Sequence, residues 1–216
     1  MGRQPEARSR TVGARPLLYY ITDRQALPGN SVLPVIERAI EAGVELIQVR
    51  ERDLETRSLL SLVEGAAERA EGRPSRLLVN DRLDVALTAG VGLHLPTHGL
   101  PVAEVRQGYP TLLIGASCHS QEELRRAEEG GADFAVFGPV YETPSKEPFG
   151  PPLGVEKLAL AVGAVGIPVL ALGGITVENA VACLQAGAAG LAGISLFQGA
   201  ADLRQTVAAL RALKTG

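Results

Sequence analysis

The sequence is poor in aromatic residues and in residues that build metal or disulfide frameworks. Of its 216 residues, 4% are aromatic and none is Trp, whereas 46% are hydrophobic. Leu, Val, Ile and Ala must therefore fill the interior, as they do in buried parallel sheets. The two cysteines, Cys118 and Cys183, lack metal-type spacing, which argues against a zinc site and against a disulfide framework. A reducing cytoplasm is the expected compartment.

An excess of charge of one sign and an uninterrupted apolar span are also lacking. The net charge of −3 favours neither a nucleic-acid surface nor a strongly acidic tail. The apolar stretch 158–175 contains glycines and Pro168, so it is interpreted as a helix end, a turn and a buried strand, and no membrane partner is expected. Residues 1–15 carry four Arg against one Glu, and we expect a disordered arm there, followed by one domain over 16–216.

Short aliphatic runs alternate with helical patterns along the whole domain. Helical periodicity is clear, for example, over 32–42 and 121–129. The eight candidate strands are residues 17–23, 46–51, 76–81, 92–96, 112–118, 134–141, 169–174 and 190–195. Alternation of this kind indicates parallel strands with right-handed crossovers.

A weak repeat marks the joints between helices and strands. Gly43, Gly90, Gly131 and Gly187 each follow a helical pattern, where a left-handed residue ends the helix. Eight strand–helix units predict a single (β/α)8 TIM barrel. An open doubly wound sheet is the alternative, although the first strand is not followed by the Gly-x-Gly-x-x-Gly turn of its nucleotide-binding form.

Polar residues gather at the predicted carboxyl ends of the strands, where barrel enzymes carry their chemistry. After the second strand, Gln48, Arg50 and Arg52 share one face and are expected to point into the barrel mouth. Two cations there need an anion or a carboxylate, and either a ligand phosphate or Asp81 would serve. A purely structural Arg–Asp network is the alternative.

The last two strand ends predict a phosphate site. The Gly173-Gly174 turn leaves backbone N–H groups open to an oxygen, and Ser195 precedes a short helical turn with further donors. The alternative is that the glycines only permit a tight turn. His119 follows the fifth strand and is suited to proton transfer near neutral pH, or else only satisfies a loop hydrogen bond. The direction of His94 is left open.

These strand-end motifs resemble the thiamine-phosphate-synthase and TenI superfamily over about residues 17–199. The motifs that carry the resemblance are Tyr20-Ile-Thr-Asp23, Gln48-Val-Arg-Glu-Arg52, Val79-Asn-Asp-Arg82, Ile114-Gly-Ala-Ser-Cys-His119, Phe137-Gly-Pro-Val-Tyr-Glu-Thr143, Leu172-Gly-Gly-Ile175 and Gly193-Ile-Ser195. The superfamily holds two activities. Thiamine phosphate synthase joins a pyrimidine pyrophosphate to a thiazole phosphate with Mg²⁺, and TenI-type thiazole tautomerase aromatises a carboxythiazole phosphate by moving a proton, without a metal.

Departures from the synthase pattern decide between the two activities. The synthases have Lys at the position of Arg52, and Asp81 matches one of their magnesium ligands. Their second carboxylate falls at Gly99, where this sequence has none. The resemblance therefore implies a weakened Mg²⁺ site and favours a thiazole tautomerase without a cofactor; the alternatives are a Mg²⁺-dependent synthase and a catalytically inactive regulatory barrel.

The resemblance also assigns roles to individual residues. It implies that His119 transfers the proton and that a small phosphorylated thiazole is the binding partner. Family barrels often form homodimers. The substrate-binding residues it implies are Gln48, Arg50, Arg52, Asn80, Ser117, Thr143, Ser145 and Lys146, and the phosphate-binding residues are Gly173, Gly174, Ile194 and Ser195.

Overall fold

The computed structural model describes residues 15–143 and 151–213, and within them eight parallel strands close into a barrel. Each strand pairs with the next along the chain, and the eighth pairs with the first. The strands are β1 (Leu17–Ile21), β2 (Leu46–Val49), β3 (Arg76–Asn80), β4 (Gly92–Leu95), β5 (Ile114–Cys118), β6 (Phe134–Phe137), β7 (Val169–Leu172) and β8 (Gly190–Gly193). The (β/α)8 prediction is confirmed, and the open sheet is excluded.

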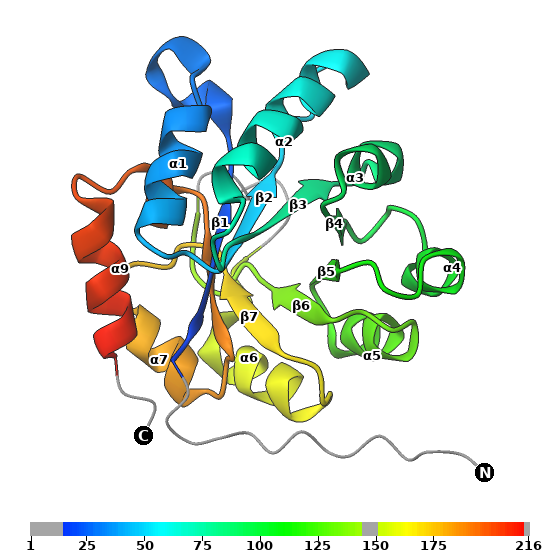
Figure 1. Ribbon diagram of the computed structural model, residues 1–216. Helices are drawn as coiled ribbons and strands as arrows, with labels where there is room; N and C mark the ends of the chain where they lie inside the picture. The colour runs from blue at the N-terminus through cyan, green and yellow to red at the C-terminus, as the bar shows by residue number, and fades with distance from the viewer. Residues whose placement is uncertain (1–14, 144–150, 214–216) are drawn as a thin grey trace.

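Helices surround the strands on the outside of the barrel (Figure 1). They are α1 (Leu33–Glu41), α2 (Thr56–Ala70), α3 (Leu83–Ala89), α4 (Val102–Gly108), α5 (Gln121–Glu129), α6 (Gly154–Gly163), α7 (Ala180–Gln185), α8 (Ser195–Gln198) and α9 (Leu203–Ala212). Two short 3₁₀ turns, η1 (Arg24–Ala26) and η2 (Pro28–Asn30), follow β1. The predicted arm over residues 1–15 lies outside the described residues except for its last position.

Seven of the eight strands end earlier than the sequence predicted, because the backbone turns at their carboxyl ends, whereas β5 ends at Cys118 as predicted and begins at Ile114 instead of residue 112. The predicted strand 134–141 stops at Phe137, and the predicted strand 169–174 stops at Leu172. Gly173 then adopts φ +99°, and Asp81, directly after β3, adopts φ +58°. Left-handed residues cannot continue an extended strand, so the polar residues that follow belong to the loops. These loops form the mouth of the barrel.

The predicted helix-to-strand joints are confirmed. The four glycines that the sequence placed there all adopt positive φ: Gly43 (82°), Gly90 (66°), Gly131 (88°) and Gly187 (90°). Glycine takes this conformation without the steric cost that a Cβ would add.

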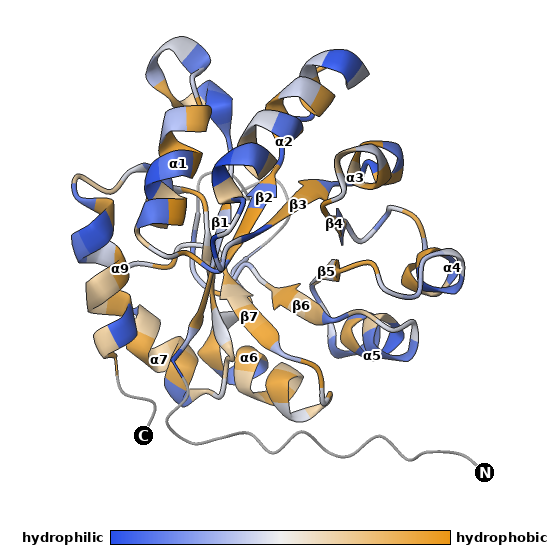
Figure 2. Cartoon of the chain, in the orientation of Figure 1, coloured by the Kyte–Doolittle hydropathy of each residue, from blue (hydrophilic) through white to orange (hydrophobic). Residues whose placement is uncertain are grey.

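The hydrophobic core has two layers, one inside the barrel and one between strands and helices. The inner layer is small, and its aromatic members Tyr19 and Phe134 meet edge to face with ring centroids 5.3 Å apart. The outer layer is larger and includes the two cysteines, Cys118 and Cys183. In Figure 2, β6 and β7 are mostly hydrophobic, whereas α1 and α9 also carry hydrophilic residues. Among the described residues, no helix is both long and apolar enough to cross a bilayer.

Candidate active site at the barrel mouth

A continuous hydrogen-bonded chain crosses the inside of the barrel just below its mouth. The amide Nε2 of Gln48 donates to the hydroxyl of Tyr19 at 2.7 Å. That hydroxyl lies 3.0 Å from Nδ1 of His94, and Nε2 of His94 lies 2.8 Å from Oγ of Ser117. The chain thus connects β1, β2, β4 and β5. Tyr19, Gln48 and His94 are almost completely buried, and Ser117 is half-buried at the open end.

Burial keeps the titratable members of this chain neutral. Burial, together with the smaller effect of the nearby positive charge of Arg50, lowers the pKa of His94 to about 3. Burial also raises the pKa of Tyr19 well above its usual range, with the hydrogen bond from Gln48 acting weakly in the opposite direction. His94 and Tyr19 therefore act as neutral hydrogen-bonding groups at physiological pH. The sequence left the direction of His94 open, and the fold places it inside the barrel.

Two arginines follow β2 at the mouth without an ion-pair partner in the described part of the chain. Arg50 is half-buried, and its pKa is lowered first by burial and then by the charge of Arg52. Arg52 is exposed. Asp81, which the sequence offered as a possible partner, forms no ion pair with either among the described residues. The structural Arg–Asp network is thus not formed, and the two cations remain available to an anion.

The loop that carries Arg50 is held in place by the next residue. Glu51 is buried and accepts hydrogen bonds from the hydroxyl of Thr22 and from the backbone N–H of Arg24. The Thr22 hydroxyl oxygen in turn accepts the backbone N–H of Arg50 at 2.9 Å. Burial is the main cause that raises the pKa of Glu51. This network ties the end of β1 to the end of β2 and fixes where the arginine side chains begin.

The residues expected to bind phosphate lie side by side. Because β7 pairs with β8, with Leu172 opposite Ala192, Gly174 and Ser195 emerge at the same end of neighbouring strands. Gly174 adopts φ +62°, and a Cβ there would lie 2.3 Å from the carbonyl oxygen of Glu142. Ile194 caps α8 and exposed Ser195 begins it, so the first N–H groups of this turn have no partner within the helix. Their binding of a phosphate stays a prediction.

His119 follows β5 and is exposed at the mouth. Its ring Nδ1 makes a short contact with the carbonyl oxygen of Gly138, which follows β6. A carbonyl oxygen accepts only, so a neutral ring carries its proton on Nδ1 and leaves Nε2 as an acceptor. The loop hydrogen bond that the structural alternative for His119 required is therefore present. It also fixes one ring nitrogen of His119 against the loop after β6.

Asp81, the candidate magnesium ligand, is not part of a cluster of metal ligands among the described residues. Asp81 is exposed, next to half-buried Asn80. A Cβ at Gly99 would lie 2.7 Å from Oδ1 of Asp81, so position 99 adjoins this carboxylate but supplies none of its own. Within the described residues, no three His, Cys, Asp or Glu side chains group as metal ligands. Mg²⁺ in phosphate sites uses one or two carboxylates plus phosphate oxygens. Asp81 thus fits only a metal that the substrate itself largely holds.

The remaining predicted residues belong to the loop after β6. Thr143 is the last described residue before the gap in this loop, and Ser145 and Lys146 lie outside the described residues.

Tyr19 is a member of the site that was not predicted from the sequence. Tyr20 belongs to the quoted motif, but it points to the outer core, where its hydroxyl donates to Gln198 at 2.8 Å. Alternation along β1 was the only signal in the sequence, since it places Tyr19 on the opposite face from Tyr20. The structure shows that this face is the inner one, where Ile21 pairs with Gln48.

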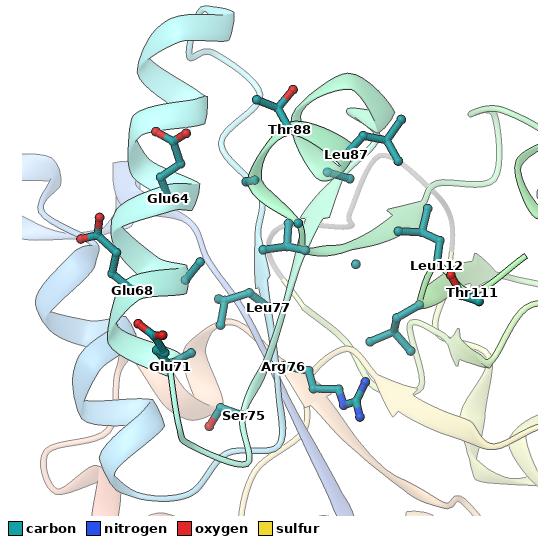
Figure 3. Close-up of a pocket in the computed structure, with 18 residues that line it drawn as sticks. Glu64, Glu68, Glu71, Ser75, Arg76, Leu77, Leu87, Thr88, Thr111 and Leu112 are labelled. Atoms are coloured by element: carbon teal, nitrogen blue, oxygen red, sulfur yellow. The ribbon is translucent and has the colours of Figure 1, made fainter. Parts of the chain in front are cut away.

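A cavity of about 1030 Å³ lies elsewhere, beside the starts of β3 and β4. Glu64 and Glu68 of α2 and Glu71, which directly follows α2, lie on one side of this cavity, and Leu87 of α3 and Leu112 of the loop before β5 lie on the other (Figure 3). Because it adjoins the amino ends of strands, it is separate from the barrel mouth.

Fold and polar residues together define a (β/α)8 barrel whose candidate site lies at the carboxyl ends of the strands, as in enzymes of this architecture. The chain belongs to the TMP-TENI family, described as Thiamine monophosphate synthase, which it matches over residues 18–197. The members of this family are enzymes of thiamine biosynthesis.

Individual relatives cover nearly the whole chain. "Putative thiamine-phosphate synthase" of Geobacter sulfurreducens is 45% identical over 198 residues, which are 91% of this chain and 93% of that protein. Thiamine-phosphate synthase of Roseiflexus castenholzii is 39% identical over 91% of this chain and 87% of its own length. The solved thiamine phosphate pyrophosphorylase of Pyrococcus furiosus superposes with a TM-score of 0.81 at 34% identity and covers 91% of this chain and 94% of that one.

Proposed function

We propose that the protein is a thiamine-phosphate synthase, which joins a pyrimidine pyrophosphate to a thiazole phosphate. The observation that supports the proposal is that two groups of potential donors to anions lie at the mouth. One consists of Arg50 and Arg52 after β2, and the other consists of the backbone donors after β7 and β8. Because β1 lies between β8 and β2 in the barrel, the two groups are separated, as a reaction between two phosphorylated substrates requires.

The names of the relatives support the same activity and not the tautomerase that the sequence analysis favoured. In this reaction the thiazole ring forms a bond to the carbon that carries the pyrophosphate, while the bond from that carbon to the pyrophosphate oxygen breaks and the leaving pyrophosphate takes the electron pair. Negative charge develops on the leaving pyrophosphate, and it is stabilised by Arg50, Arg52 and Ser117. Stabilisation of developing charge by preorganised donors is a common way in which active sites lower a barrier. Mg²⁺ held by Asp81 and the pyrophosphate would neutralise further charge.

A thiazole tautomerase remains the second candidate, because two observations favour it. His119 is oriented by the carbonyl of Gly138 with Nε2 free to take a proton, and position 99 lacks a carboxylate. In that case His119 moves a proton between the ring and its exocyclic carbon, and no metal is required.

A single assay with both substrate sets, each with and without Mg²⁺, distinguishes these activities. We expect thiamine phosphate to form only when the pyrimidine pyrophosphate, the thiazole phosphate and Mg²⁺ are all present. Aromatisation of carboxythiazole phosphate without metal, abolished by His119→Asn, would instead establish the tautomerase. Absence of turnover with either set would contradict both and point to the inactive regulatory barrel.

The role of the arginines is tested within the same assay. Arg50→Gln should lower the rate of thiamine phosphate formation about a hundredfold, because it removes a charge that faces the leaving group. Arg57→Gln is the matched control, since Arg57 is exposed on α2 and should leave the rate unchanged. Equal rates for both variants would remove Arg50 from the reaction.

A further inference from the structure

The hydrogen bonds that connect Gln48, Tyr19, His94 and Ser117 run in one donor-to-acceptor direction, which follows from the first donor. An amide nitrogen only donates, so the oxygen of Tyr19 accepts from Nε2 of Gln48 over 2.7 Å. The phenol has one proton, and Nδ1 of His94 lies 3.0 Å away as its available acceptor. A ring nitrogen that accepts carries no proton. In a neutral ring the proton therefore lies on Nε2 of His94.

The same logic continues to the mouth of the barrel. With the proton on Nε2, His94 donates to Oγ of Ser117, which lies 2.8 Å away. A hydroxyl has one proton, and with its oxygen already accepting from His94 that proton is free to point elsewhere. Ser117 is the last member of this hydrogen-bonded series and is half-buried where the barrel opens. The other three members are almost completely buried. Each bond in the chain polarises the next, which strengthens the final donor.

We propose that Gln48, Tyr19 and His94 are positioning residues that orient the Ser117 hydroxyl as a hydrogen-bond donor toward an anionic oxygen in the barrel mouth. The inference deepens the proposed function, because the pyrophosphate of the pyrimidine substrate supplies such an oxygen. No proton is transferred along the chain. Tyr19 and His94 act only through the direction of the bonds that they make.

Packing around the ring of His94 preserves this arrangement. A Cβ at Gly115 would lie 2.8 Å from Nδ1 of His94 and 2.4 Å from the ring of Phe134, so only glycine leaves room for both side chains. Tyr19 also contacts this group, with its ring centroid 5.7 Å from that of His94. The imidazole therefore lies close to Tyr19, Gly115 and Phe134, which pack around it.

The protonation of His94 can be observed directly by nitrogen NMR of protein labelled at its histidines. The chain has three histidines, so His98→Asn and His119→Asn spectra assign the remaining signals to His94. We expect Nε2 to carry the proton and Nδ1 to behave as an acceptor in the unliganded protein. A proton on Nδ1 of His94 would overturn the proposal. This measurement requires no substitution of Gln48, Tyr19, His94 or Ser117.

The consequence for binding is tested with Tyr19→Phe and with inorganic pyrophosphate as the probe in calorimetry. Loss of the phenol hydroxyl should disturb the His94 signals and raise the dissociation constant for pyrophosphate about tenfold, the effect of one hydrogen bond to a charged group. Tyr20→Phe is the matched control, because it removes a buried hydroxyl from the same strand on its other face. It should leave the His94 signals and the dissociation constant unchanged.

These measurements separate the inference from the proposed function. If Tyr19→Phe changes neither the His94 signals nor pyrophosphate binding, the directed chain is wrong whatever the protein catalyses. If the chain behaves as expected but no thiamine phosphate forms in the assay, the proposed function fails and the oriented anion donor stands.

Discussion

At the scale of single residues, His94 shows how burial converts a titratable side chain into a fixed hydrogen-bonding group. Burial lowers the pKa of His94 to about 3, whereas its unfolded value is that of a free imidazole. Between these values the unfolded chain binds a proton at His94 and the folded chain does not. The contribution of His94 to stability therefore decreases as the pH falls below the unfolded pKa.

We predict that this residue makes the protein less stable in mild acid. Between pH 7 and pH 5 its contribution to the free energy of unfolding should fall by about 2 kcal/mol, measured by urea denaturation. His94→Asn should lose this part of the pH dependence. The exposed His98 provides the control, and His98→Asn should keep the wild-type pH dependence. Identical pH profiles for His94→Asn and the wild type would show that the ring is not held neutral.

At the scale of elements, the joint between β7 and its loop depends on glycine for both shape and space. Gly174 has φ +62°, and a Cβ would approach the carbonyl oxygen of Glu142 to 2.3 Å. A non-glycine residue would thus strain the backbone and displace the loop after β6. Both effects act on the place where a phosphate is expected.

Gly174→Ala should therefore reduce the free energy of unfolding by at least about 2 kcal/mol and weaken the binding of a thiazole phosphate. Urea denaturation and calorimetric titration measure the two effects. Gly163→Ala, at the end of α6, is the comparison, since a Cβ there meets no atom within 4 Å. It should be neutral or slightly stabilising. If the two alanine variants were equally stable, the close approach at Gly174 would be disproved.

At the scale of the whole molecule, the last helix connects the end of the chain to the amino side of the barrel. Arg211 of α9 donates to Glu45, before β2, at 2.7 Å and also contacts the carbonyl oxygen of Gly43. Glu45 also accepts the backbone N–H of Leu18 in β1 at 3.1 Å. One half-buried ion pair thus joins α9, β1 and the start of β2, the region where the barrel closes.

Arg211→Ala should lower the free energy of unfolding by about 1–3 kcal/mol, because a partly buried carboxylate and a carbonyl lose their donor. Arg204→Ala tests the same helix with an exposed ion pair to Glu41, for which we expect a loss below about 1 kcal/mol. Chemical denaturation of both variants measures the difference. A larger loss for Arg204→Ala would show that α9 is held by surface charge and not by this pair.

The sequence by itself determined the architecture and the end of the barrel where the polar residues gather. Periodicity and the glycine joints specify local structure, and eight strand–helix units have few ways to close, so the (β/α)8 fold followed. The placement of Gly174 beside Ser195 followed for the same reason, because consecutive parallel strands end together.

Only the tertiary structure decided which side chains meet across the barrel. Strand lengths were overestimated because the turns after Phe137 and Leu172 depend on neighbouring loops. Tyr19 joins Gln48 and His94 through contacts from three strands, and these depend on register and closure, which no local pattern encodes. The same is true of Gly99, whose position beside Asp81 arises where two loops converge.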